Sequence, residues 1–269
     1  MKAKITGKTA VITGGASGIG AAIGRKFGKE GARIVIIDMD GDNAGTMKRE
    51  LEDAGIPAMA ISCDVTDEKA CQEAMRKIIH ETGGIDILVN NAGITQRSSF
   101  RDTEISVYRK VMEVNFFGSL NCTKAAIESI IERKGTIVVT SSIAGLGPLL
   151  GRTGYSASKH ALHGLFESLR TEVSHLGVNI LMLCPGFTRT NLQSRALDAD
   201  GSITRHAQST MGKQDSPEHV AEKLYRAVMK RKPIVVLTLS GKAGYLLNRL
   251  FPSLYEKIII KNFKKELER

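Results

Sequence analysis

The sequence predicts an α/β fold built on a doubly wound, parallel, seven-stranded sheet with helices on both faces. Short runs rich in β-branched residues alternate with longer segments of helical period along most of the 269 residues. Several of the short runs are apolar on both faces, which is typical of strands that helices cover on both sides. Strands and helices that alternate in this way form right-handed crossovers within one sheet.

The predicted elements follow one another without a repeat or a low-complexity linker. The strands are expected at Thr9–Thr13, Arg33–Ile37, Ala58–Ile61, Asp86–Val89, Thr136–Thr140, Val178–Leu183 and Ile234–Leu239. The helices are expected at Ile19–Glu30, Asp42–Ala54, Asp67–Thr82, Glu104–Arg133, Thr153–His175 and Pro217–Arg231. Composition changes only near Lys242, so residues 1–241 are interpreted as one domain and residues 242–269 as a basic, amphipathic helical extension.

Composition narrows the classes of protein to consider. The four cysteines have no metal-type spacing, which favours a reduced, cytoplasmic protein without a metal site over a disulfide scaffold. The first residues have too short an apolar run for a signal peptide, and no stretch approaches the length of a membrane-spanning helix. Much of the formal charge of +10 lies in the extension, and no zinc-finger or RNA-binding signature is present, so we expect no nucleic-acid partner.

A glycine-rich turn follows the first predicted strand, in "TAVITGGASGIG". Gly14, Gly18 and Gly20 would let the backbone turn sharply and approach a pyrophosphate at a helix N-terminus, as in a Rossmann-type dinucleotide site. An ordinary strand-to-helix turn is the alternative. Asp38, at the end of the second strand, strengthens the dinucleotide interpretation, because a carboxylate there accepts ribose hydroxyls and repels a 2′-phosphate. NAD is therefore favoured over NADP.

Two more short segments lie where predicted strands end, which is where open α/β sheets bind their ligands. In "CDV", Asp64 is placed to accept a hydrogen bond from an adenine amino group. In "NNAG", Asn90 and Asn91 have short amide side chains that satisfy backbone groups at a tight turn. Each segment taken singly is more often structural; their order and position make the set informative.

Tyr155 and Lys159 stand four residues apart on a predicted helix, in "YSASK". Residues at this spacing share a helix face, so both side chains can point into one cleft. A nearby ammonium stabilises a phenolate and is expected to lower the tyrosine pKa, which would make Tyr155 a usable general acid and base. The alternative is a core tyrosine with a lysine that extends to solvent.

Ser142 follows the fifth strand, thirteen residues before Tyr155, and can offer a hydroxyl to a substrate carbonyl. With "TGGASGIG", "NNAG", "SS" before "YSASK", and "PG" at Pro185–Gly186, the sequence resembles the short-chain dehydrogenase/reductase family in its compact one-domain form. The motifs occur in the family's order and spacing over about residues 5 to 240. Individually they are modest signals, but together they are specific.

This resemblance implies roles for particular residues. Tyr155 would exchange the proton, Lys159 would hold the nicotinamide ribose and tune Tyr155, and Ser142 would orient the substrate oxygen. Asn115 matches a helix-kinking asparagine that supports a water chain to Lys159. Besides the three glycines of the turn, the positions that match the lining of the dinucleotide site are Ser17, Ile19, Asp38, Asp64, Val65, Asn91, Ala92, Gly93, Tyr155, Lys159, Pro185, Gly186, Thr188 and Thr190.

Two of these positions bear on how the resemblance applies to this chain. Thr188 replaces the family's usual Val or Ile, a change that its backbone contacts can survive. Ser17 stands where relatives that prefer NADP often carry a basic residue. The lack of a basic residue there favours NAD, as does Asp38. The reaction implied is the NAD-dependent interconversion of a secondary alcohol and a ketone, by an enzyme that is a homodimer or homotetramer. A non-catalytic dinucleotide-binding redox sensor or membrane-associated scaffold is the alternative.

Residues 187–216 are polar and lack periodicity, and we interpret them as a substrate lid. Met211 and Leu197, together with Leu146, Leu149 and Leu150, suggest a partly apolar pocket for a steroid-, retinoid- or lipid-like substrate; the alternative is that they only pack the loop. In the extension, apolar residues at helical spacing predict two amphipathic helices, the second opened by Pro252. This pair would cover the domain or a partner subunit, or would lie at an anionic membrane surface as a peripheral contact.

Overall fold

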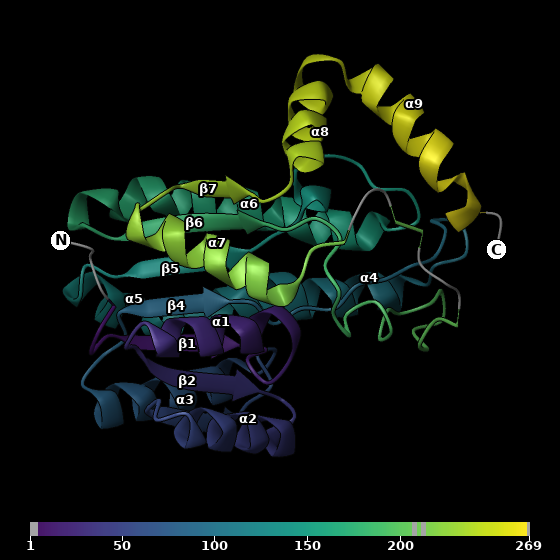
Figure 1. Ribbon diagram of the computed structural model, residues 1–269. Coiled ribbons are helices and arrows are strands. Elements are labelled where there is room, and N and C mark those ends of the chain that lie inside the picture. The colour runs from purple at the N-terminus through teal and green to yellow at the C-terminus, as the bar shows by residue number, and fades with distance from the viewer. Residues whose placement is uncertain (1–4, 206–208, 211–213, 268–269) are drawn as a thin grey trace.

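The computed structural model describes residues 5–205, 209–210 and 214–267. Its centre is a parallel sheet with the strand order β3-β2-β1-β4-β5-β6-β7 (Figure 1). The strands are β1 (Thr9–Thr13), β2 (Arg33–Asp38), β3 (Ala58–Ser62), β4 (Ile87–Asn90), β5 (Thr136–Thr140), β6 (Asn179–Cys184) and β7 (Ile234–Val236). The chain turns back after β3 to place β4 beside β1, so the sheet is doubly wound and the predicted fold class is confirmed.

Helices cover both faces of this sheet. Those of the first 230 residues are α1 (Gly18–Lys29), α2 (Gly41–Asp53), α3 (Glu68–Thr82), α4 (Ile105–Met112), α5 (Gly118–Glu132), α6 (Thr153–Val173) and α7 (Pro217–Met229). Side chains of α1, α2 and α7 share one core cluster with Ile12, Ile34 and Ile36 of the strands. Side chains of α3, α5 and α6 share the other cluster with Val11 and Val35. Alternate strand residues are thus buried on opposite faces, which explains why the strands carry apolar residues on both faces.

The segment predicted as one helix over Glu104–Arg133 contains a change of helical type. After α4 the chain makes a π-helical turn, Glu113–Phe117, and only then continues as α5. Asn115 lies at the middle of this turn and is fully buried. A π-helical turn adds one residue to the local hydrogen-bonded ring and re-aims the side chains beside it, and such turns are frequent at functional sites.

The extension leaves the sheet earlier than predicted. β7 ends at Val236, whereas the sequence predicted a strand up to Leu239. The strand ends early because a helix begins at Leu239. The Thr238 hydroxyl caps this helix by accepting a hydrogen bond from the Gly241 amide. The boundary placed after residue 241 therefore falls within the first turn of this helix.

Two helices form the extension, α8 (Leu239–Leu250) and α9 (Pro252–Phe263). They rise beyond the β7 edge of the sheet and form an inverted V whose second arm descends toward the C-terminal end of the described chain (Figure 1). Pro252 occupies the first turn of α9, as predicted. A search of the described residues finds no helix with the length and apolar character that a membrane span requires.

Candidate active site

A cavity of about 940 Å³ opens at the carboxyl ends of the strands. Its walls come from the segments after β1, β2, β3, β4, β5 and β6, and its outer side is formed by residues between Phe187 and Ile203. This is the place where an open parallel sheet binds its ligands, beside the reversal of strand order between β1 and β4. Of the predicted site residues, all but Gly20 and Asn115 line this cavity.

The glycine-rich turn forms one end of the cavity. Gly14 and Gly18 have φ values of 60° and 53°, a region that glycine adopts without strain. A Cβ atom on Gly14 would lie 2.9 Å from Ala92 Cα, and one on Gly20 would lie 2.2 Å from the Gly14 carbonyl oxygen. Gly20 therefore serves the packing of α1 against the turn, and the other glycines leave backbone amides at the cavity wall.

Asp38 stands at the end of β2 with both carboxylate oxygens engaged by the backbone. Oδ2 accepts a hydrogen bond from the Ala16 amide at 3.1 Å, and Oδ1 accepts one from the Asp40 amide at 3.2 Å. These two bonds fix the carboxylate beside the glycine turn, on the cavity wall. A ligand with hydroxyl donors at this end would meet a pre-positioned acceptor.

Asp64 and Val65 form the next part of the wall, after β3. Asp64 Oδ1 accepts hydrogen bonds from the Thr66 amide and hydroxyl, both at 2.9 Å. Val65 packs against Gly118 at the start of α5, where a Cβ atom would lie 2.6 Å from Val65 Cγ2. Glycine at position 118 therefore lets α5 approach this wall closely.

The "NNAG" segment joins the glycine turn to β4. The Asn91 backbone amide donates to Thr13 Oγ1 at 2.9 Å, and its side-chain Nδ2 donates to the carbonyl oxygens of Thr13 and Gly14 at 3.1 and 3.2 Å. Asn90 instead points into the core and donates to Thr123 Oγ1 at 2.8 Å. The two neighbouring asparagines thus have different structural roles, and only Asn91 lines the cavity.

Tyr155 and Lys159 lie one turn apart on α6 and both face the cavity. Lys159 Nζ donates a hydrogen bond to the Thr140 carbonyl oxygen at the end of β5, at 2.8 Å, and lies 5.6 Å from the centre of the Tyr155 ring. Ser142 reaches the same cavity from the segment that follows β5, where its Oγ accepts a hydrogen bond from the Ala144 amide at 3.1 Å. The structure therefore brings together three of the four predicted catalytic residues on one surface.

Burial changes the acidity of both groups on α6. It raises the pKa of Tyr155 above the usual value for a phenol, against smaller opposing effects of a hydrogen bond with Ser142 and the positive charge of Arg152. It lowers the pKa of Lys159 to about 8, because the ammonium is almost wholly removed from water. The expected lowering of the tyrosine pKa by Lys159 is thus not found, because burial is the largest effect on the pKa of both residues.

Asn115, the fourth predicted catalytic residue, lies behind the cavity wall. Its Oδ1 accepts a hydrogen bond from the Ile94 amide at 2.8 Å, and its Nδ2 donates to the Ile94 carbonyl oxygen at 3.0 Å and to Ser158 Oγ at 2.8 Å. Gly93 separates it from the cavity: a Cβ atom there would lie 3.0 Å from Asn115 Oδ1 and 3.6 Å from Lys159 Nζ. Asn115 therefore ties the π-helical turn to the segment after β4 and to α6, beside the lysine.

The segment after β6 closes the cavity over the glycine turn. Pro185, Gly186, Thr188 and Thr190 all line it. A Cβ atom on Gly18 would lie 3.3 Å from Thr190 Cγ2, so the two segments are in contact range. Thr188 pairs with Asp215 in an isolated parallel bridge, which joins the two ends of the predicted lid.

The apolar pocket predicted from five residues is confirmed only in part. Leu149 and Leu197 line the large cavity, and Leu150, although described, does not. Leu146 borders a separate cavity of about 50 Å³ beneath α8 and α9, and Met211 lies outside the described residues. The sequence analysis missed further lining residues, notably Leu192, Ile203, Lys110, Glu113, Arg195 and Arg152. Arg152 could have been predicted, because it stands three residues before Tyr155 at the start of the same helix and so shares a helix face with it.

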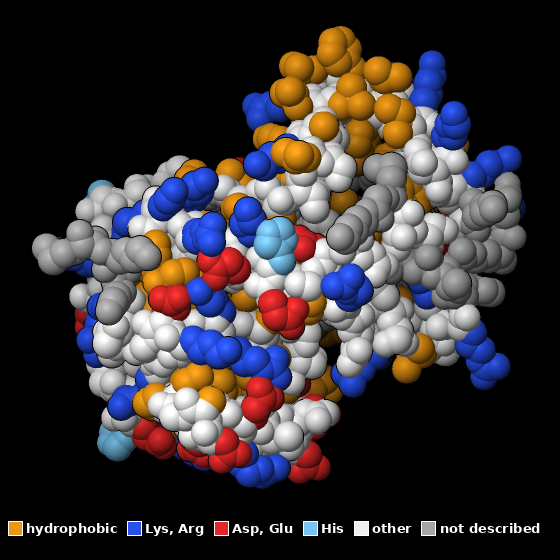
Figure 2. Space-filling view, in the orientation of Figure 1, with side chains coloured by type: hydrophobic (Ala, Val, Ile, Leu, Met, Phe, Trp, Pro, Cys, Tyr) orange, Lys and Arg blue, Asp and Glu red, His pale blue; other side chains and the backbone are white. Residues whose placement is uncertain are grey.

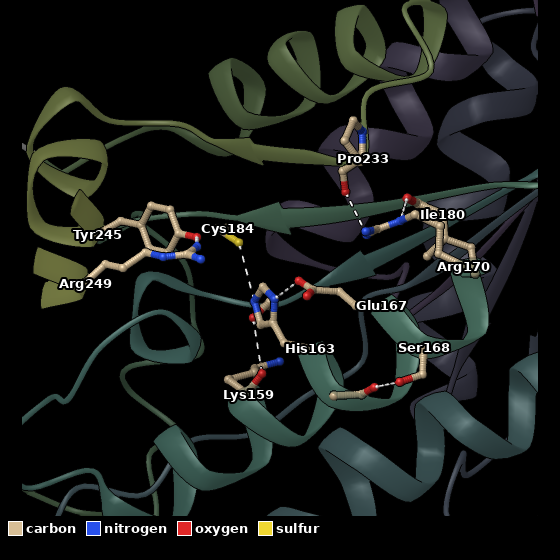
Figure 3. A network of polar contacts seen from close by, with 12 residues as sticks. Lys159, His163, Glu167, Ser168, Arg170, Ile180, Cys184, Pro233, Tyr245 and Arg249 are labelled. Carbon is tan, nitrogen blue, oxygen red and sulfur yellow. Dashed lines mark hydrogen bonds and ion pairs between the residues drawn. The ribbon is translucent and has the colours of Figure 1, made fainter. Parts of the chain in front are cut away.

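Of the two histidines that follow Tyr155, His163 contacts its own helix and the end of β6. His163 Nδ1 lies 2.8 Å from Glu167 Oε1, and its Nε2 lies 3.8 Å from Cys184 Sγ (Figure 3). Two turns along the same helix, Arg170 donates to the carbonyl oxygens of Ile180 and Pro233, each at 3.0 Å. These contacts hold α6 to the β6 edge of the sheet. No group of three or more His, Cys, Asp or Glu residues with the geometry of a metal site occurs in the described part of the chain.

Comparison with known proteins assigns this arrangement to a family. The sequence profile described as "short chain dehydrogenase" matches residues 8–200. Dehydrogenase/reductase SDR family member 7B of Xenopus tropicalis is 37% identical over 265 residues, which cover 95% of this chain and 85% of that protein. Dehydrogenase/reductase SDR family protein 7-like of Drosophila melanogaster is 33% identical over 268 residues, which cover 97% and 82%.

A solved structure agrees with this assignment. The crystal structure of a short chain dehydrogenase/reductase from Burkholderia phymatum in complex with NAD superposes with a TM-score of 0.83 at 25% sequence identity. The match covers 93% of this chain and 96% of that one. The resemblance read from the motifs is thereby confirmed.

The pKa of Lys159 predicts how the stability of the ligand-free protein depends on pH. Between about pH 8 and the ordinary lysine value of 10.5, the unfolded chain holds a proton that the folded chain has released, so stability rises with pH across this window. Lys159→Met removes this dependence. We expect the stability of the variant relative to wild type to be greater at pH 7 than at pH 10.5, by on the order of 3 kcal/mol.

Urea denaturation of both proteins across this pH range measures the difference between their free energies of unfolding. Titratable groups that both proteins contain contribute equally and cancel from this difference. The variant Lys223→Met, at an exposed position of α7, reports any effect that comes only from losing a charge. A relative stability of Lys159→Met that does not change between pH 7 and 10.5 would contradict the burial argument.

Proposed function

We propose that this chain, which belongs to the short-chain dehydrogenase/reductase family of oxidoreductases, interconverts a secondary alcohol and a ketone with NAD(H). One observation carries the proposal: Ser142, Tyr155 and Lys159 face a single cavity whose other end is formed by the glycine turn and Asp38. Acid–base groups at one end and a dinucleotide cradle at the other are what such a reaction requires.

The residues present fit a dinucleotide. The turn that contains Gly14 and Gly18 offers backbone amides at the N-terminus of α1, where a pyrophosphate is favourably bound. Asp38 and Asp64 offer acceptors for the adenosine part, and Lys159 lies at the opposite end, beside Tyr155. A nicotinamide dinucleotide bound here would supply or accept the hydride.

Tyr155 is the proposed proton donor in ketone reduction and proton acceptor in alcohol oxidation, at its phenolic oxygen. Its raised pKa keeps the phenol protonated near neutral pH, which suits the donor role. Ser142, which is close enough to Tyr155 for a hydrogen bond, would hold the substrate oxygen toward Tyr155. Lys159, with a pKa of about 8, can take up and release a proton near neutral pH and so exchange protons at this end of the cavity.

Asp38 supports a preference for NAD over NADP. Its carboxylate is fixed by two backbone amides, so it cannot turn away without losing both hydrogen bonds. A ribose hydroxyl can donate to this acceptor, whereas a 2′-phosphate would bring a second negative charge against it.

The substrate is proposed to be an apolar alcohol or ketone of steroid, retinoid or lipid size. Leu149, Leu192, Leu197 and Ile203 give the cavity an apolar section beside the predicted lid. The volume of about 940 Å³ is near the upper end of the range for small-molecule sites, as expected of a cavity that takes a cofactor and a substrate together.

Tyr155→Phe tests the reaction. It removes the proposed proton donor while keeping the ring, so we expect turnover to fall by about 10² to 10⁴-fold with little change in NADH affinity. NADH formation is measured across a panel of secondary alcohols, from short aliphatic to steroid-sized, and NADH binding by fluorescence titration. Tyr225→Phe removes a phenol on α7, away from the cavity, as a control. Wild-type protein that binds NADH and turns over none of the panel would favour the redox-sensor alternative.

Asp38→Ala tests the cofactor preference. Loss of the carboxylate removes both the ribose acceptor and the repulsion of a 2′-phosphate, so the ratio of kcat/KM for NADP over NAD should rise by about tenfold or more. Asp53→Ala, at the far end of α2, should leave the ratio unchanged. An unchanged ratio in the Asp38 variant would refute the role assigned to this carboxylate.

A further inference from the structure

The outer side of the extension carries a cluster of exposed apolar side chains where α8 and α9 meet. We call Leu246, Leu250, Phe251, Leu254 and Ile258 the apolar tip; between 36% and 60% of each residue is exposed. Figure 2 shows hydrophobic side chains gathered over this projecting part of the molecule. Isolated exposed leucines are ordinary on a protein surface, but a contiguous apolar group of this kind marks a contact surface.

The opposite side of the same helix pair already packs against the domain. Asn248 Nδ2 donates a hydrogen bond to the Leu146 carbonyl oxygen at 3.1 Å, and a Cβ atom on Gly147 would lie 3.1 Å from the Tyr255 ring. Ile259 and Phe263 of α9 are buried. Covering the domain therefore uses the inner side of the pair and does not account for the apolar tip.

Basic residues flank the apolar tip. Lys242, Arg249, Lys257 and Lys261 are exposed on the same two helices. Glu256 is the single acidic residue between positions 239 and 263 of the sequence. An apolar apex with basic flanks matches the layers of an anionic bilayer, where acyl chains lie beneath negatively charged headgroups.

A second copy of this chain fits the surface less well. In a twofold-symmetric dimer, the same patch faces itself, so two apolar tips in contact would bring their basic flanks together. With Glu256 alone to offset them, these like charges would oppose association. We propose that α8 and α9 dock this protein reversibly on an anionic membrane surface, with the apolar tip inserted at the boundary between headgroups and acyl chains.

The docking helices are in contact with a wall of the large cavity. The Phe263 ring of α9 stacks on Phe187, with ring centres 6.0 Å apart and planes inclined by 29°. Phe187 also lines the large cavity. A bilayer bound at the apolar tip would thus lie close to the cavity, where an apolar substrate dissolved in the membrane could reach it. This consequence rests on the proposed function, whereas the docking itself does not.

Vesicle flotation of the full chain tests the docking. Wild type should bind vesicles of phosphatidylcholine with about 30 mol% phosphatidylserine at low salt, and should bind pure phosphatidylcholine or high-salt samples at least about tenfold more weakly. The double variant Leu250→Glu/Phe251→Glu should lose about tenfold or more in partition coefficient. The double variant Phe100→Glu/Ile105→Glu places the same two charges on exposed apolar residues outside the extension, 70% and 71% exposed, and should bind like wild type.

A second pair of variants separates the charge from the apolar contact. Arg249→Glu/Lys257→Glu should abolish the preference for phosphatidylserine while the apolar tip is intact. Thermal unfolding and NADH titration of every variant verify that the fold and the cofactor site are unchanged, and these readouts do not depend on turnover.

Three results would overturn the proposal. Wild type could fail to float with either vesicle, or the variant of the apolar tip could bind as tightly as wild type. Light scattering could also show a wild-type oligomer that the same variant dissociates, which would assign the apolar tip to a second copy of the chain. Failure of the proposed function would appear elsewhere, as absent turnover in a protein that still binds vesicles.

Discussion

The site depends on the hydrogen bond between Lys159 Nζ and the Thr140 carbonyl oxygen, which joins α6 to the end of β5. This contact fixes the helix one turn away from Tyr155, so the phenol and the ammonium cannot move independently. A glycine makes the approach possible, because a Cβ atom on Gly145 would lie 2.9 Å from the Lys159 carbonyl oxygen. Helix α6 is therefore positioned by close backbone packing as well as by its side chains.

Burial of Lys159 lowers the folding stability of the protein, but it also shifts the lysine pKa toward a value that suits proton transfer. The pKa of about 8 for Lys159, below the ordinary lysine value of 10.5, means that the charged form is less favourable in the folded protein than in the unfolded chain. The Thr140 carbonyl oxygen offsets part of this penalty, and Asn115 holds the neighbouring backbone through Ile94 and Ser158. Perturbed groups that share a cavity are typical of functional sites, because a group selected for packing alone would be neutral and apolar.

Local patterns explain why much of this arrangement could be predicted from the sequence. Strand positions such as Val11 and Ile12 are both buried, on opposite faces, so an uninterrupted apolar run identifies them. Gly14 and Asp38 follow strands directly, and the carboxyl ends of parallel strands meet at one edge. The early start of α8 could also have been predicted from the sequence, because threonine is a common N-cap residue and Thr238 stands three positions before Gly241.

Other features depend on tertiary contacts that no local pattern encodes. The raised pKa of Tyr155 results from burial by segments far apart in the chain, and the sequence alone suggested the opposite direction. The π-helical turn at Asn115 is held by bonds to Ile94 and Ser158, which are 21 and 43 residues away. Which of the predicted leucines face the large cavity depended in the same way on where the lid and the extension pack.

The most direct test of the account follows the hydride itself. The protein is incubated with NADH deuterated at C4 of the nicotinamide and with bulky apolar ketones, and the products are analysed by mass spectrometry. The account predicts alcohol with one deuterium at the carbinol carbon from wild type, and little or none from Lys159→Met. Tight NADH binding without deuterium in any product, or undiminished transfer by the Lys159 variant, would contradict the claim that the buried lysine and its tyrosine form the reactive centre.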